Sequence, residues 1–180
     1  MTQPKPFEIS IPQAKIDAIM TRVRDYKWFA APDLPGDWML GMSTPVMKDI
    51  QSYWLEQFDW RAAEATLNRY PNYHAEVDGL DIHYVHVVGE AEGKRPLILT
   101  HGWPGSIYEF WEAIGPLAYP SQHGGHRSDA IDLIIPSLPG YGFSEKPAAP
   151  VDQRRTAALW NTLMQDVLGY KSYLAQGGDW

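Results

Sequence analysis

The chain has 180 residues, enough for about one domain with a substantial core, and its 44% hydrophobic and 21% charged residues are typical of a folded globular protein. Its formal net charge of -7, with no long basic run, gives no electrostatic support for binding to nucleic acid or to an anionic membrane. The sequence contains no cysteine, which excludes disulfides, thiolate metal sites and a cysteine nucleophile.

The N-terminus shows no sign of a targeting segment. Residues 1–15 lack the apolar region of a signal peptide, and no later apolar run approaches the length of a membrane span. We therefore expect a soluble, cytoplasmic protein without a membrane anchor. The 8 tryptophans and 10 tyrosines fit either a large aromatic core or an aromatic-lined pocket, and composition alone favours the core.

Residues 1–71 are predicted to form a helical N-terminal lead. Residues 12–27 have the apolar spacing of an amphipathic helix, with a proline at its start. The next stretch, residues 29–44, is interrupted by prolines and glycines, so we expect a loop there. Thr44 is the predicted N-cap of a second helix, and Asp59 that of a shorter third helix.

Residues 72–180 show a different pattern, which predicts an α/β fold. Alternating runs on either side of Asp78-Gly79 indicate a β-hairpin. Short apolar runs then alternate with helical stretches, and this order predicts parallel strands. The predicted strands are "PLILT", "AIDLIIPSL" and "KSYLAQ", and the predicted helices are "IYEFWEAIGPL" and "DQRRTAALWNTLMQDVLG". In the second helix, Asp152 suits the start and Gly169 the end.

Two glycine-rich turns follow predicted strands, where the chemistry of such sheets is found. The first is "HGWPGS", residues 101–106, whose glycines allow a tight turn that can direct the Trp103 N–H at an anion. The second is "GGDW", residues 177–180. By itself, the first is equally typical of a simple strand-to-helix loop, and Asp179 in the second, taken alone, is better explained as a helix N-cap than as a nucleophile.

Taken together, the two turns favour a nucleophile. A hydrolase elbow holds its nucleophile on a strained turn flanked by small residues, and Gly177 lies two residues before Asp179. A serine there would need a base, whereas a carboxylate is already ionised at neutral pH and can attack an alkyl carbon to form an ester.

The motifs "HGWPGS", "PSLPGYGFSEKP" (136–147) and "QGGDW", with the lead "DWMLGMS" and "YWLEQFDWRAAEATLNRYPNYHAEVDGLDIHYVHV", resemble the epoxide hydrolases of the microsomal type in the α/β-hydrolase superfamily. The resemblance runs from Phe7 to Trp180. It implies the N-terminal half of an α/β-hydrolase fold: a β-hairpin and parallel strands with helices, preceded by the lead.

The resemblance also implies roles for individual residues. Asp179 would be the nucleophile that opens a small hydrophobic epoxide. The backbone N–H groups of Trp103 and Trp180 would form an oxyanion hole, where one donor is typically worth about 2.7–4 kcal/mol, and Trp103 would also contact the substrate. Ser144 receives no nucleophilic role, because no Gly-x-Ser-x-Gly is present. No cofactor and no metal are implied.

The histidines depart from the family pattern, in which the acid and the histidine follow the nucleophile. All six, at positions 74, 83, 86, 101, 123 and 126, precede Asp179. His101 is expected to brace its turn through hydrogen bonds. The others carry no shared metal: His83 and His86 should point to opposite faces of a strand, and the last two should be exposed. We expect the N-terminal part of an enzyme, inactive alone, with cap, acid and histidine supplied by a downstream segment or a second chain.

Two alternatives remain open from the sequence. One is a haloalkane dehalogenase-like hydrolase, which also uses an aspartate followed by tryptophan; the long lead and "WPGS" disfavour it. The other is a non-catalytic protein that uses the hydrolase half as a binding module.

Overall fold

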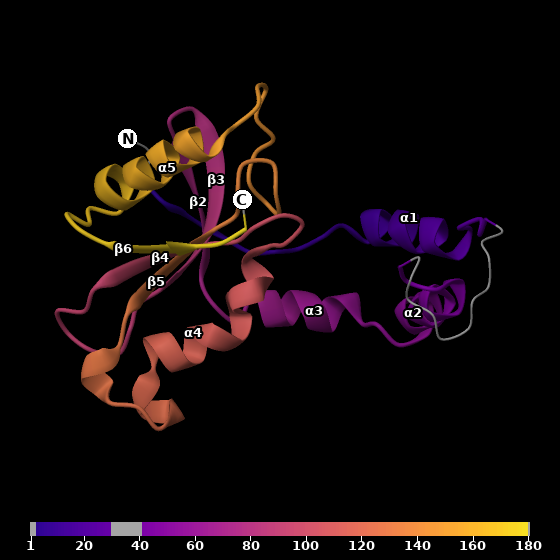
Figure 1. Ribbon diagram of the computed structural model, residues 1–180, viewed down its shortest axis with the longest axis horizontal. Helices are drawn as coiled ribbons and strands as arrows, with labels where there is room; N and C mark the ends of the chain where they lie inside the picture. Colours follow the sequence, from indigo (N-terminus) through magenta and orange to yellow (C-terminus); the bar gives the residue numbers. More distant parts are fainter. Residues whose placement is uncertain (1–2, 30–40, 180) are drawn as a thin grey trace. The chain divides into compact units, whose positions relative to one another are not determined.

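The computed structural model describes residues 3–29 and 41–179, and these form two compact units (Figure 1). The first unit contains the described residues up to Ile9 and from Leu67 onward, and the second contains those within Ser10–Thr66. A separate domain over residues 1–71 stays a prediction.

The second unit contains helices at the predicted places. Helix α1 spans Gln13–Arg24, α2 spans Thr44–Glu56, and α3 spans Trp60–Leu67. The N-cap of α2 is Ser43 instead of the predicted Thr44, which is the first residue of the helix itself. The expected loop at 29–44 lies mostly outside the described residues.

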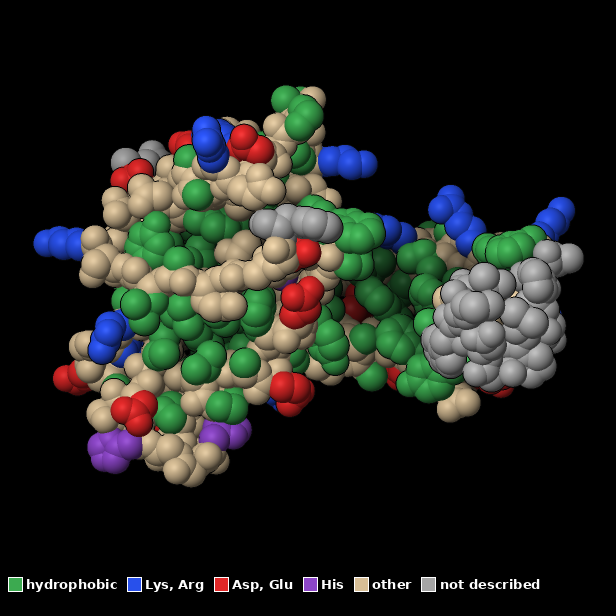
Figure 2. Space-filling view, viewed as in Figure 1, with side chains coloured by type: hydrophobic (Ala, Val, Ile, Leu, Met, Phe, Trp, Pro, Cys, Tyr) green, Lys and Arg blue, Asp and Glu red, His purple; other side chains and the backbone are tan. Residues whose placement is uncertain are grey.

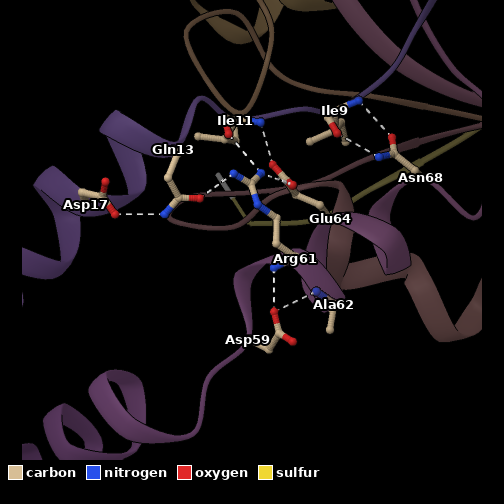
Figure 3. Close-up of polar contacts among 9 residues, drawn as sticks. All are labelled: Ile9, Ile11, Gln13, Asp17, Asp59, Arg61, Ala62, Glu64 and Asn68. Carbon is tan, nitrogen blue, oxygen red and sulfur yellow. Dashed lines mark hydrogen bonds and ion pairs between the residues drawn. The ribbon is translucent and has the colours of Figure 1, made fainter.

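The cap of α3 is confirmed, and a polar cluster lies beside it (Figure 3). The Asp59 carboxylate accepts hydrogen bonds from the backbone N–H groups of Arg61 (2.8 Å) and Ala62 (3.1 Å). Glu64, 6% exposed, accepts from the Ile11 N–H at 2.6 Å and from the Arg61 guanidinium at 2.5 Å. The Ile11 hydrogen bond, followed by that from Arg61, lowers the pKa of Glu64, so the buried carboxylate is held ionised and fully partnered.

The first unit is built on a six-stranded sheet with the order β1-β2-β3-β5-β4-β6. The predicted hairpin is confirmed: β2 and β3 pair antiparallel around Asp78 and Gly79, which both have positive φ. The predicted parallel strands are also confirmed, because β4 pairs parallel with both β5 and β6. Strand β3 pairs antiparallel with β5, and β1 with β2. The strands span Lys5–Phe7 (β1), Asn72–Val77 (β2), Leu80–Val87 (β3), Pro96–Thr100 (β4), Asp132–Pro136 (β5) and Leu174–Gly177 (β6).

Helices cover both faces of this sheet (Figure 1). On one face, α5 (Gln153–Thr162) and the π-helical turn that continues it contribute Leu159, Trp160, Leu163 and Met164 to a buried apolar cluster. On the other face, α4 (Trp111–Ala118), preceded by the 3-10 helix η1 (Ile107–Phe110), contributes to a second cluster. The predicted cap of α5 is confirmed, since Asp152 accepts from the Arg155 N–H at 2.8 Å.

Within residues 3–29 and 41–179, no helix is both long enough and apolar enough to cross a bilayer.

Candidate active site

The three parallel strands bring their carboxyl ends to one edge of the sheet. Thr100, the last residue of β4, lies opposite Gly177, the last of β6, and β5 ends on the other side of β4. The segments that follow are therefore neighbours, and they contain both glycine-rich turns found in the sequence.

The turn after β4 is held tightly by its own backbone. The carbonyl of Gly102 accepts a hydrogen bond from the Gly105 N–H at 2.8 Å. The peptide bond between Trp103 and Pro104 is cis, and the Trp103 side chain is 64% exposed. The backbone N–H of Trp103 lies at the sheet edge, outside any regular secondary structure.

Asp179 lies directly against this turn. Its carboxylate oxygen Oδ2 accepts a hydrogen bond from the Trp103 N–H, joining residues 76 positions apart. Its φ is +79°, in the left-handed region that is uncommon for residues other than glycine. A side chain at Gly102 would not fit, because an added Cβ would lie 2.4 Å from both Cβ and Oδ2 of Asp179. The glycine is thus required by the close approach of the carboxylate.

His101 is 2% exposed and braces the turn, as predicted. Its Nε2 accepts from the backbone N–H of Leu138 at 3.1 Å, and its Nδ1 lies 3.1 Å from the Gly102 carbonyl oxygen. Both ring nitrogens are occupied. His101 therefore has no free nitrogen with which to activate water.

The segment after β5 is anchored by a buried polar network that the sequence analysis missed. His83, fully buried, contacts Ser137 Oγ through Nδ1 and Asn72 Oδ1 through Nε2, both at 2.9 Å. Ser144 accepts from the His83 N–H at 3.0 Å and donates to the Ser137 carbonyl at 2.7 Å. Ser144 therefore has a structural position, in keeping with the absence of a nucleophilic role for it.

The His83 ring in this network is neutral. Burial, with a smaller contribution from the neighbouring His74, lowers the pKa of His83 to about 3. The alternation of His83 with Val85 and Val87, both buried, was the signal in the sequence that could have placed this histidine inside. His86 points to the other face, as predicted, and contacts the Tyr170 hydroxyl at 3.1 Å. His123 and His126 are exposed, as predicted.

A cleft of about 560 Å³ opens over the Trp103–Asp179 contact. Its walls come from the segments after β4, β5 and β6 and from one side of α5, together with the residues just before that helix. The apolar part of the wall consists of Leu138, Pro139, Tyr141, Val151, Ala157 and Trp160. Trp103 also lines the cleft, whereas Trp180 lies outside the described residues. The cleft thus combines a carboxylate that receives a backbone N–H with a largely apolar wall.

Two family models match the chain. One, described as "Epoxide hydrolase N terminus", matches residues 4–110, and the other, described as "alpha/beta hydrolase fold", matches residues 95–180. A curated relative, "Putative epoxide hydrolase" of Stigmatella aurantiaca, is 44% identical over 176 residues, which is 97% of this chain and 40% of the relative.

Solved structures give the same result. The juvenile hormone epoxide hydrolase of the silkworm Bombyx mori superposes with a TM-score of 0.89 at 35% identity, covering 100% of this chain and 42% of that one. The epoxide hydrolase of Aspergillus niger superposes with a TM-score of 0.84 at 36% identity, covering 99% and 46%. The chain therefore spans less than half the length of these relatives.

Proposed function

We propose, from the premise that this chain belongs to the epoxide hydrolases of the α/β-hydrolase superfamily, that it supplies the nucleophile and both backbone donors of the oxyanion hole for opening a small hydrophobic epoxide to a diol. The observation that carries the proposal is the hydrogen bond from the Trp103 N–H to Oδ2 of Asp179, on a residue with a left-handed backbone. Trp103 also lies where it can contact the substrate in the cleft.

The proposed reaction has two steps. In the first, an oxygen of Asp179 bonds to an epoxide carbon while the ring C–O bond breaks, and the ring oxygen takes a proton from an acid. In the second, water adds to the ester carbonyl while a base takes its proton. The bond between the carbonyl carbon and the alkyl oxygen then breaks, the alkyl oxygen takes that proton from the base, and the diol leaves with the Asp179 carboxylate restored. The carbonyl oxygen becomes negative in this second step, when the N–H groups of Trp103 and Trp180 would stabilise it.

The water in the second step needs a base. Both nitrogens of His101 are occupied, and the remaining histidines are buried elsewhere, bonded to other groups or exposed on other elements. We infer that the base, its acid partner and the proton donor come from a segment equivalent to the part of the relatives that this chain does not match. The 180-residue chain by itself should then release no diol.

The test is an oxygen-labelling experiment on the chain joined after Trp180 to the remaining part of the Stigmatella aurantiaca relative. Many turnovers are run in heavy-oxygen water, and the peptide containing Asp179 is then weighed. We expect label in the Asp179 carboxylate, because each ester hydrolysis leaves one solvent oxygen there. The controls are the joined protein with Asp179→Asn and the unjoined chain. Neither should form any diol, even in a single turnover.

An active joined enzyme with an unlabelled Asp179 would show that another residue is the nucleophile. Supplying a haloalkane in place of the epoxide distinguishes the dehalogenase alternative, since only a dehalogenase releases halide. The absence of any turnover, with epoxide bound in the cleft, would favour a binding module.

A further inference from the structure

The two hydrogen bonds of His101 define its protonation state. A backbone N–H can only donate, so the bond from Leu138 requires Nε2 to carry a lone pair. The ring proton is then on Nδ1, which donates to the Gly102 carbonyl. A doubly protonated ring would place Nε2–H against the Leu138 N–H. The contacts are therefore those of the neutral ring protonated on Nδ1.

The acceptor of the Nδ1–H bond belongs to the same peptide group as the donor to Asp179. The carbonyl of Gly102 and the N–H of Trp103 share one planar amide, so fixing the direction of the C=O also fixes that of the N–H. Two donors hold this carbonyl: Nδ1 of His101 and the Gly105 N–H. The Trp103 N–H consequently points away from His101 and toward Oδ2 of Asp179.

We infer that His101 is a positioning residue: through Nδ1–H it orients the Gly102–Trp103 amide so that the Trp103 N–H addresses the Asp179 carboxylate. Its imidazole also joins the turn after β4 to the segment after β5 through Leu138. Ser137, the residue before Leu138, is tied to the buried His83 ring, so the support reaches the centre of the sheet. The contact itself is a property of the fold; only its catalytic meaning rests on the proposed function.

Two substitutions of His101 separate its two hydrogen bonds. His101→Asn places an amide N–H near the position of Nδ1–H, which retains the donor to Gly102 and loses the acceptor for Leu138. His101→Gln places its carboxamide oxygen near the position of Nε2, which retains the acceptor and loses the donor. If His101 merely filled space, the two substitutions would have similar effects on the Trp103 amide.

The readout is the backbone amide of Trp103 in the 180-residue chain, observed by nitrogen-15 NMR. In the wild type it should be shifted downfield and slow to exchange, and Asp179→Ala should abolish both properties. In His101→Gln its exchange should quicken by about tenfold or more, the factor expected for losing one hydrogen bond to a charged group. In His101→Asn it should stay close to the wild type. The imidazole nitrogens should show the proton on Nδ1.

An unchanged Trp103 amide in His101→Gln, or a wild-type ring protonated on Nε2, would overturn the inference; the second result does not depend on the folding of any variant. In the joined enzyme, His101→Gln should lower kcat by about tenfold or more, since ester hydrolysis uses this N–H, while kcat/KM changes far less. If the amide responds as expected but no epoxide is turned over, the proposed function fails and the positioning role stands.

Discussion

Leu97 of β4 has a leucine opposite it on each neighbouring strand, and the two leucines lie in different environments. Leu133 of β5 is fully buried, whereas Leu174 of β6 is 43% exposed. The difference extends along the strands: every residue of β5 is buried and every residue of β6 is exposed. Figure 2 shows hydrophobic side chains on both sides of the β6 backbone on the viewed face.

The comparison shows that the two halves of the candidate site have unequal support. Trp103 follows β4 and is fixed through His101 to the segment after β5, which is anchored to the buried His83. Asp179 follows β6, whose described contacts within the sheet come from β4 alone. Local openings start where few buried contacts oppose them, so the carboxylate should move more freely than the N–H that it meets.

The largest expected effect contrasts the two leucines directly. Leu133→Ala should lower the free energy of unfolding by about 2–5 kcal/mol, because it leaves a cavity in the core. Leu174→Ala, the matched truncation on the other side of Leu97, should cost less than about 1 kcal/mol, since the side chain is partly in water already. Urea unfolding of both variants measures the difference, and equal losses would show that β6 is as firmly packed as β5.

The sequence predicted the elements whose signals are local. Asp59 and Asp152 cap their helices, and Asp78-Gly79 turns the hairpin, because each acts on residues two or three positions away. Strand β1 was missed: three residues are too short to show a period, and the strand exists through its pairing with β2, about 65 residues later.

The candidate site was less predictable from the residues alone. The spacing suggested a turn at Trp103 and another at Asp179, and the resemblance to epoxide hydrolases joined them; the hydrogen bond between them spans 76 positions. The partners of His83 lie 11 and 54 positions away, so a single sequence can indicate that this ring is buried but not what it bonds to.

An effect of intermediate size is the loss of stability at low pH that comes from the buried His83, which anchors the segment after β5. The pKa of His83 is about 3 when folded, against about 6.5 when unfolded, so the unfolded chain binds more protons between these values. The contribution of this ring to stability is complete above pH 6.5 and is lost as pH falls toward 3. From pH 8 to pH 5 it should decline by about 2 kcal/mol.

His83→Gln isolates this contribution. Glutamine can still donate to Asn72 but does not titrate, and all carboxylates are common to both proteins. The variant should be less stable at pH 8 and should lose less stability on acidification. If the free energy of unfolding fell equally with pH in the wild type and in His83→Gln, groups other than His83 would cause the acid sensitivity.

The smallest expected change in stability is at the contact between Gly102, in the firmly held turn after β4, and Asp179, in the segment after the exposed strand β6. In Gly102→Ala the added methyl would lie 2.4 Å from Cβ and Oδ2 of Asp179, so one partner must move. Because Asp179 follows an exposed strand, it should yield, and the free energy of unfolding should change by no more than about 0.5 kcal/mol. The carboxylate would nevertheless leave the Trp103 N–H, whose amide signal should respond as it does in Asp179→Ala.

Gly178→Ala is the matched control, since an added methyl there meets no atom within 4 Å. A loss of 2 kcal/mol or more in Gly102→Ala, with the Trp103 amide unchanged, would mean that β6 holds Asp179 as rigidly as β5 holds its own neighbours, and the proposed inequality between the two strands would be wrong.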